Sequence, residues 1–145
     1  MNTHTFVSES NKIEGILRPP TRAEIAEHDR FIALEIITIA ELEHFVSVYQ
    51  PDAALRNRKG MDVRIGNYFP MRGGTAIKEA LGDLLLNMDV SPWKKHIEYE
   101  RLHPFMDCNG RSGRALWAWM MMRQRGSYYL GFLHHFYYQT LRELR

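Results

Sequence analysis

The 145-residue chain is poor in cysteine, in net charge and in long apolar runs. A single cysteine excludes an internal disulfide framework. A formal net charge of +2 is too small to favour nucleic acid or an anionic membrane as a partner. No apolar run approaches the roughly 18 residues of a membrane span, and no signal peptide is visible at the N-terminus. These absences predict a cytoplasmic protein with no membrane or nucleic-acid partner, although export without a cleaved signal would leave no mark on the sequence.

The residues that are present predict one mainly α domain. Apolar residues make up 45% of the chain and charged residues 25%, which are ordinary values for a globular protein with a sizeable core. A polar start, residues 1–20, ends at a pair of prolines. Apolar periodicity and helix start signals then predict helices at about 22–48, 75–88, 92–102 and 132–144, and one that starts near 110 and runs through 120. Residues 55–74 are rich in arginine and glycine and predict an irregular or hairpin-like segment.

The most informative stretch is His-Pro-Phe-Met-Asp-Cys-Asn-Gly-Arg-Ser-Gly-Arg, residues 103–114. Proline disfavours α conformation at the residue before it, so the preceding helix should end at His103. A new helix should start near Gly110, and its N-terminus, with free N–H groups and partial positive charge, forms an anion site. Arg111 and Arg114 share one face of its first turn, where the helix dipole disfavours cations. A multiply charged anion such as a polyphosphate would account for both arginines.

This string resembles the signature of the Fic (Fic/Doc) family, His-Pro-Phe-x-Asp/Glu-Gly-Asn-Gly-Arg-x-x-Arg. Most members transfer AMP from ATP to a protein hydroxyl, and their fold is a helical bundle with a small β-hairpin flap. The resemblance covers residues 8 to about 125 and implies the same fold, with a Fic catalytic domain at 21–145. Every chemically named position matches except one, because Cys108 stands where the family usually has glycine.

Two residues of the loop are candidates for the chemistry itself. An imidazole ordinarily titrates near neutral pH, so His103 can take the proton from an attacking hydroxyl as a general base. The alternative is a histidine that only ends a helix. Asp107 is a candidate Mg²⁺ ligand, because Mg²⁺ is typically held by one or two carboxylates plus substrate phosphates. A helix-capping role for Asp107 is compatible with metal binding.

Four further residues are expected to bind the nucleotide. Asn109 and Gly110 would turn the backbone so that successive N–H groups face the α- and β-phosphates. Arg111 and Arg114 would neutralise the phosphates and orient the leaving group. The family's second arginine, which corresponds to Arg114, holds the γ-phosphate.

Cys108 allows two interpretations. If this position has a positive φ, a cysteine there costs on the order of 1 kcal/mol in strain. The favoured interpretation is a tolerated substitution with no function. The alternative is a redox-sensitive thiol whose pKa is depressed by the helix N-terminus and the two arginines.

A second motif lies in the N-terminal segment. Residues 10–15, Ser-Asn-Lys-Ile-Glu-Gly, resemble the inhibitory motif of Fic proteins, Ser/Thr-x-x-x-Glu-Gly/Asn. Ser10 and Glu14 are four apart and would share one face of a short helix around residues 8–15, which Gly15 can end in a left-handed conformation. In the family this glutamate pairs with the second arginine, here Arg114, and blocks productive ATP binding. The alternative is an ordinary exposed turn.

A third motif predicts the flap. Met61, Val63 and Ile65 alternate with polar residues, as in a strand, and Gly66-Asn67 suits a type II′ turn. The stretch resembles the family's flap, whose edge pairs with an extended target segment. The resemblance assigns target binding to Val63, Arg64, Ile65 and Gly66, and the alternative is a purely structural hairpin.

Together these motifs predict an autoinhibited protein adenylyltransferase that uses ATP and Mg²⁺ to modify a Ser, Thr or Tyr hydroxyl of a target protein, with release of pyrophosphate. The alternatives are removal of AMP, with Glu14 positioning a water, transfer of another phosphate-linked group, and a catalytically silent binding module. Self-modification and oligomeric state stay open at this point.

Overall fold

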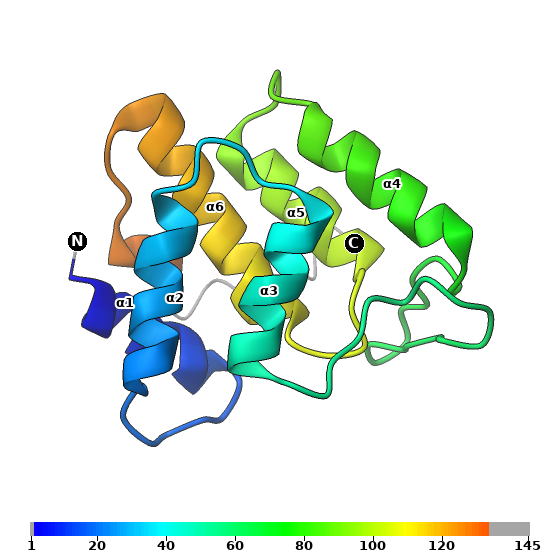
Figure 1. Cartoon of the computed structure of the whole chain (residues 1–145), viewed down its shortest axis with the longest axis horizontal. Helices are drawn as coiled ribbons and strands as arrows, with labels where there is room; N and C mark the ends of the chain where they lie inside the picture. Colours follow the sequence, from blue (N-terminus) through cyan, green and yellow to red (C-terminus); the bar gives the residue numbers. More distant parts are fainter. Residues whose placement is uncertain (1, 134–145) are drawn as a thin grey trace.

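The computed structural model describes residues 2–133, which form a mainly helical fold (Figure 1). The mainly α prediction is therefore confirmed, and no strand occurs among residues 2–133. The predicted helix at 132–144 falls almost entirely outside these described residues. The described helices are α1 (Thr3–Ile13), α2 (Arg22–Ile32), α3 (Ile39–Tyr49), α4 (Thr75–Leu86), α5 (Pro92–Leu102), α6 (Asn109–Arg125) and a short 3-10 helix, η1 (Leu130–Leu133).

Local sequence signals fix several helix ends. Thr21 and Glu24 form a reciprocal capping box at the start of α2. Ser91 caps α5 by accepting a hydrogen bond from the Lys94 N–H, and Pro92 occupies the first helical position. The helix ends at His103, directly before Pro104, as predicted.

The helix predicted over 22–48 is wrong in one respect, because it is two helices. The chain leaves α2 at Ala33, and the Leu34 carbonyl accepts hydrogen bonds from Trp119 and Arg123 of α6, both at 2.7 Å. Thr38 then caps α3 by accepting a hydrogen bond from the Glu41 N–H. The apolar run across the break looked continuous in the sequence, yet Ile36 within it is 70% exposed.

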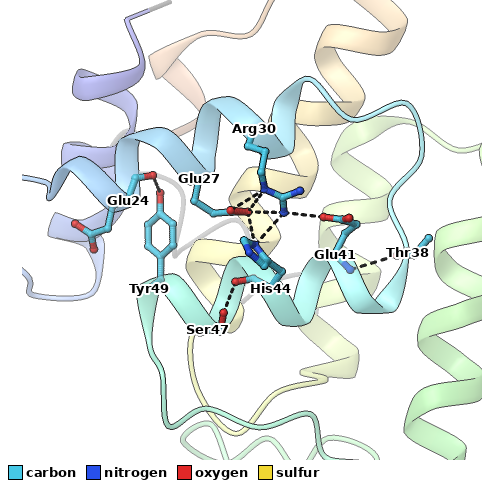
Figure 2. A network of polar contacts seen from close by, with 8 residues as sticks. All are labelled: Glu24, Glu27, Arg30, Thr38, Glu41, His44, Ser47 and Tyr49. Atoms are coloured by element: carbon cyan, nitrogen blue, oxygen red, sulfur yellow. Dashed lines mark hydrogen bonds and ion pairs between the residues drawn. The ribbon is translucent and has the colours of Figure 1, made fainter.

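A polar network joins α2 to α3 (Figure 2). The Arg30 guanidinium donates to the carboxylates of Glu27 and Glu41, each at 2.6 Å, and His44 Nδ1 lies 2.9 Å from Glu27. The Tyr49 hydroxyl donates to the Glu24 carbonyl at 2.7 Å. These contacts hold the C-terminal end of α3, which forms part of the candidate site, against α2.

Helix α6 lies at the centre of the fold and packs against α1, α2, α3 and α5. Its residues 111–121 are buried on every side, as expected of a helix enclosed by others. Close packing with α5 requires glycine at Gly113, because a Cβ there would lie 2.8 Å from a Glu100 carboxylate oxygen and 3.0 Å from the Tyr99 ring. Within the described residues, no helix is both long and apolar enough to cross a membrane.

The predicted hairpin is present only as a turn. Ile65 and Tyr68 exchange two backbone hydrogen bonds, at 2.9 and 2.8 Å, around Gly66, whose φ of +58° suits the first central position of a type II′ turn. No strand extends from this pair within the described chain, so the alternation of Met61, Val63 and Ile65 was misleading. Side chains hold the loop instead, because Arg56 donates to the Met61 carbonyl.

Helix α1 is seated by an aromatic cluster. The Phe6 ring packs 5.0 Å from the His28 ring and 5.1 Å from the Tyr128 ring, and His28 Nε2 lies 3.0 Å from the Tyr128 hydroxyl. Thr3 adds a 2.6 Å hydrogen bond to Asp29. Burial disfavours the charged imidazole and lowers the pKa of His28 to about 4.

This buried histidine predicts a loss of stability in mild acid. An unfolded histidine binds its proton near pH 6.5, whereas His28 in the folded protein stays neutral to about pH 4. The stabilisation is therefore complete above pH 6.5 and is lost as the pH falls towards 4, by on the order of 2–3 kcal/mol. Urea unfolding at pH 7, 6, 5 and 4 measures the slope of the free energy of unfolding against pH. In the His28→Gln variant most of this slope should be absent. Equal slopes in the two proteins would contradict this explanation.

Candidate active site

A pocket of about 1270 Å³ opens between the C-terminal end of α5, the N-terminal end of α6, the turn at 65–68 and the end of α1. It collects nearly all the residues that the sequence singled out, from segments far apart in the chain. Ser10 is the exception, since it lies behind the pocket wall and contacts Arg114. The predicted residues that line the pocket are Glu14, Val63, Arg64, Ile65, Gly66, His103, Asp107, Asn109, Gly110, Arg111 and Arg114.

His103 ends α5 in a left-handed conformation, with φ 50° and ψ 63°. Its Nδ1 lies 3.0 Å from the Glu100 carbonyl oxygen, which can only accept a hydrogen bond. Nδ1 must therefore carry the proton, and a neutral ring has its lone pair on Nε2. This tautomer suits a general base that acts through Nε2.

Arg56 holds His103 in this strained conformation, and the sequence analysis missed it. The side chain is fully buried, and its Nε and Nη2 donate to the carbonyls of His103 and Leu102 at 2.6 and 2.9 Å. A guanidinium at the C-terminus of α5 is favoured by the helix dipole, which offsets part of the cost of burial. Burial lowers the pKa of Arg56. In sequence, an arginine in an irregular loop shows no sign of this role.

The backbone around Arg56 joins the same two segments. Its N–H donates to the Pro104 carbonyl at 2.9 Å, and the Met106 N–H donates to the Ala54 carbonyl at 2.9 Å. Leu55 and Phe105 form an isolated antiparallel bridge between these bonds. The loop after α3 therefore fixes the position of the 103–108 segment.

Asp107 is the one carboxylate of the 103–114 segment, and it is exposed and lines the pocket. One of its oxygens accepts the Cys108 N–H at 2.7 Å. Residues 2–133 contain no cluster of three His, Cys, Asp or Glu side chains that would hold a metal by protein ligands alone. Mg²⁺ does not require such a cluster, because it retains waters and binds substrate phosphates. One exposed carboxylate that lines the pocket fits that donor set.

Cys108 has the positive φ, 67°, that would make glycine the easier residue at this position. Its side chain is buried, and burial raises the pKa of the thiol to about 12 despite the nearby Arg111. The depressed pKa of the redox alternative is therefore not found. The thiol behaves as a small apolar side chain in the core, as the favoured interpretation supposed.

Asn109 has a structural role that the sequence did not reveal. Its amide accepts from the Phe105 N–H and donates to the Phe105 carbonyl, both at 2.8 Å, and so closes the loop. The residue before it, Cys108, makes no side-chain capping bond to α6. The N–H groups of the first turn of α6 are thus left without a side-chain cap, which is the condition for an anion site.

Arg114 is 1% exposed and fully engaged by the N-terminal segment. Its Nη2 donates to a Glu14 carboxylate oxygen at 2.7 Å and to the Ser10 carbonyl at 3.0 Å, while its Nε donates to the Ser10 hydroxyl at 2.8 Å. The ion pair expected between Glu14 and Arg114 is therefore present. Glu14 follows the last residue of α1, and Gly15 has the predicted left-handed conformation, with φ +76°.

Gly110 permits this ion pair. A Cβ at this position would collide with the Glu14 carboxylate and would lie 2.9 Å from Arg114 Nη1. The motif predicts a backbone turn at Gly110. The structure shows that the lack of a Cβ at Gly110 is also what lets the Glu14 carboxylate approach α6.

Arg111 differs from Arg114 in its partners. It is 5% exposed and lies over the Tyr49 ring, and its Nη2 donates to the Gln50 amide oxygen at 3.2 Å. No carboxylate among the described residues forms an ion pair with it, and its Nε has no hydrogen-bond partner there. Of the two arginines of this turn, Arg114 is thus paired with a carboxylate, and Arg111 has no such partner among residues 2–133.

The turn at 65–68 covers the opposite side of the pocket. The Tyr68 hydroxyl donates to the Arg101 carbonyl at 2.9 Å and fixes the turn to the end of α5. Arg64 lies at the rim, where it contacts the Gly66 carbonyl and the Phe69 ring. The four predicted flap residues therefore face the same pocket as His103 and Arg114.

Comparisons with models of known protein families and with curated proteins find no match to this chain. What the pocket can do must be inferred from its residues and their geometry.

The raised pKa of Cys108 predicts an unreactive thiol. Iodoacetamide at pH 8 should modify the folded protein at least about a hundredfold more slowly than the urea-unfolded protein, because the buried thiol is both protonated and inaccessible. Mass spectrometry of timed samples measures the two rates. Rapid modification of the folded protein would revive the redox interpretation.

Proposed function

We propose that this chain is a Fic-type protein adenylyltransferase, which transfers AMP from ATP to a hydroxyl of a target protein and is held inactive by Glu14. The observation that carries the proposal is the Glu14–Arg114 ion pair at the uncapped N-terminus of α6, inside the pocket that also contains His103. The match of residues 103–114 to the family signature supports the same conclusion.

In the proposed reaction, the target's Ser, Thr or Tyr oxygen attacks the α-phosphorus of ATP. His103 Nε2 takes the hydroxyl proton, while Nδ1–H remains hydrogen-bonded to the Glu100 carbonyl. The bond from the α-phosphorus to the bridging oxygen breaks, and pyrophosphate leaves with the electron pair. Arg111, buried without a carboxylate partner among the described residues, stabilises the negative charge that develops on the phosphates.

Bound Mg²⁺ would neutralise phosphate charge and orient the leaving group. Asp107 is the residue that would hold it, since its carboxylate faces the pocket and retains an oxygen beyond the one bonded to the Cys108 N–H.

Autoinhibition follows from competition between anions. The γ-phosphate and the Glu14 carboxylate would both bind Arg114, and a buried guanidinium that loses one anion is stabilised when another replaces it. The Glu14 side chain is 36% exposed and lies at the end of its helix, so it can be displaced without unfolding α1. In this proposal the Glu14 carboxylate occupies the position on Arg114 that the γ-phosphate would take.

Removal of AMP is the second candidate. Glu14 lines the pocket, and its partial exposure gives a water access to the carboxylate. Its bond to Arg114 favours the inhibitory role, because that contact places the Glu14 carboxylate on the cation that the γ-phosphate would need.

The Glu14→Gly variant tests the proposed function. A charge-assisted contact of this kind contributes on the order of 1.5–3 kcal/mol, so its loss should raise AMP transfer by roughly tenfold to a hundredfold. The assay follows labelled AMP from α-labelled ATP with Mg²⁺ onto the enzyme itself and onto proteins of a cell lysate. Unchanged labelling would contradict the inhibitory role.

Three control variants identify the source of any increase. Glu9→Gln removes a carboxylate from the solvent side of α1, where Glu9 pairs with Lys12, and should behave as wild type. Adding Arg114→Ala to Glu14→Gly should abolish the gain, and adding His103→Ala should reduce transfer by about 10²- to 10⁴-fold. Faster loss of AMP from a labelled target, without faster transfer, would instead favour AMP removal.

A further inference from the structure

Cationic side chains gather on the loop that forms one wall of the pocket and on the adjoining end of α5. Residues 57–73 contain four cationic side chains and one carboxylate, whereas the whole chain has a net charge of only +2. All the cationic side chains named here are exposed. We call this set the basic loop surface, and its members are Arg58, Lys59, Arg64, Arg72 and Arg101.

These charges are not neutralised by carboxylates within the described structure, although the Arg64 guanidinium contacts the Gly66 carbonyl and the Phe69 ring. No member of the basic loop surface forms an ion pair with a residue in 2–133, whereas Arg18, Arg30 and Arg114 each pair with a glutamate. The one carboxylate within residues 57–73, Asp62, has an oxygen that accepts the Gly73 N–H at 2.9 Å.

The loop that carries these charges is rigidly held. Arg56 bonds the carbonyls of Met61 and Met71 from inside, at 3.1 and 2.8 Å. A Cβ on Gly73 would collide with the Met61 carbonyl and lie 2.7 Å from the Arg58 carbonyl, so the two ends of the loop are in contact. Tyr68 fixes the tip to the Arg101 carbonyl. A preorganised surface loses little conformational entropy when it binds a partner.

Other features of the loop suit a polypeptide partner. The backbone N–H and C=O groups of Asp62, Val63 and Arg64 make no backbone hydrogen bond within the described chain. Such a segment can pair with an extended chain as a strand edge does. Phe69 and Met71, which are 71% and 46% exposed, add apolar surface next to the charges.

We propose that the basic loop surface binds an extended, acidic segment of a target protein, and so selects hydroxyl residues flanked by Asp or Glu. This inference rests on the proposed function, because it concerns the acceptor of that reaction. Backbone pairing at 62–64 fixes the segment's position, and attraction between carboxylates and the exposed arginines selects its sequence.

Peptide binding tests this inference without any transfer reaction. The probes are three fluorescein-labelled 11-residue peptides with a central serine, flanked by Glu and Asp, by Gln and Asn, or by Lys and Arg. Fluorescence polarisation at low salt with the Glu14→Gly protein measures their affinities. The acidic peptide should bind at least about fivefold more tightly than the neutral one, and added salt should remove the difference.

Charge reversal locates the binding surface. Arg58→Glu with Arg72→Glu should weaken binding of the acidic peptide on the order of tenfold, because two attractions become repulsions. Lys94→Glu is the matched control, since Lys94 is exposed in the first turn of α5, at the other end of that helix from His103. The control should bind as the parent does, and circular dichroism checks that all variants fold.

The remaining outcomes separate this inference from the proposed function. Equal binding of acidic and neutral peptides, or equal effects of the double and control variants, would overturn the acidic preference. Tighter binding of an 11-nucleotide thymidine strand, lost in the double variant, would overturn it in favour of nucleic acid. Selective binding of the acidic peptide by a protein that transfers no AMP would leave the surface assigned and the proposed function refuted.

Discussion

The positive charge of Arg114 is the constraint on which the rest of the site depends. A guanidinium that is 1% exposed needs hydrogen-bond or ionic partners, because an isolated buried charge costs several kcal/mol. The chain meets this requirement with Glu14 and Ser10, residues about a hundred positions away in sequence. The same contacts therefore hold the C-terminal end of α1 in place and neutralise a positive charge near the N-terminus of α6.

The same constraint explains the residue types and contacts around Arg114. Gly110 lacks a side chain because Glu14 occupies the space where one would be. Arg111, three residues before Arg114, is held by Gln50 and the Tyr49 ring rather than by a carboxylate. We interpret this asymmetry as a site that is half filled by the protein's own anion. In the proposed site, an entering polyphosphate could bind Arg111 directly, whereas Arg114 is already paired with Glu14.

Much of this site could be predicted because its signals are local. Pro104 ends α5, Ser91 and Pro92 begin it, and the spacing of Ser10 in α1 and Glu14 at its C-terminal cap brings both to Arg114. The break between α2 and α3 could not be predicted in this way, because it depends on hydrogen bonds from α6 to Leu34. The missing strands have a similar cause, because the Arg56 side chain holds the loop through the carbonyls of Met61 and Met71.

Arg56 and Asn109 show the limit most clearly. Each is a polar residue that looks available for ligand binding in the sequence, yet each bonds backbone groups that come close only in the folded chain. Cys108 was open to two interpretations for the same reason, since a helix N-terminus suggests a low pKa and only burial shows that the pKa is raised. Long-range packing decided the roles of Arg56 and Cys108, whereas the role of Asn109 depends on how the 105–109 loop folds back on itself.

Nucleotide affinity tests the competition at Arg114 most directly. In a His103→Ala background, which prevents turnover, calorimetry would compare ATP with ADP in the presence of Mg²⁺, with and without the Glu14→Gly change. Only ATP has the γ-phosphate that competes with Glu14, so the preference for ATP over ADP should increase about tenfold or more when Glu14 is removed. The same ratio of affinities in both proteins would contradict the account.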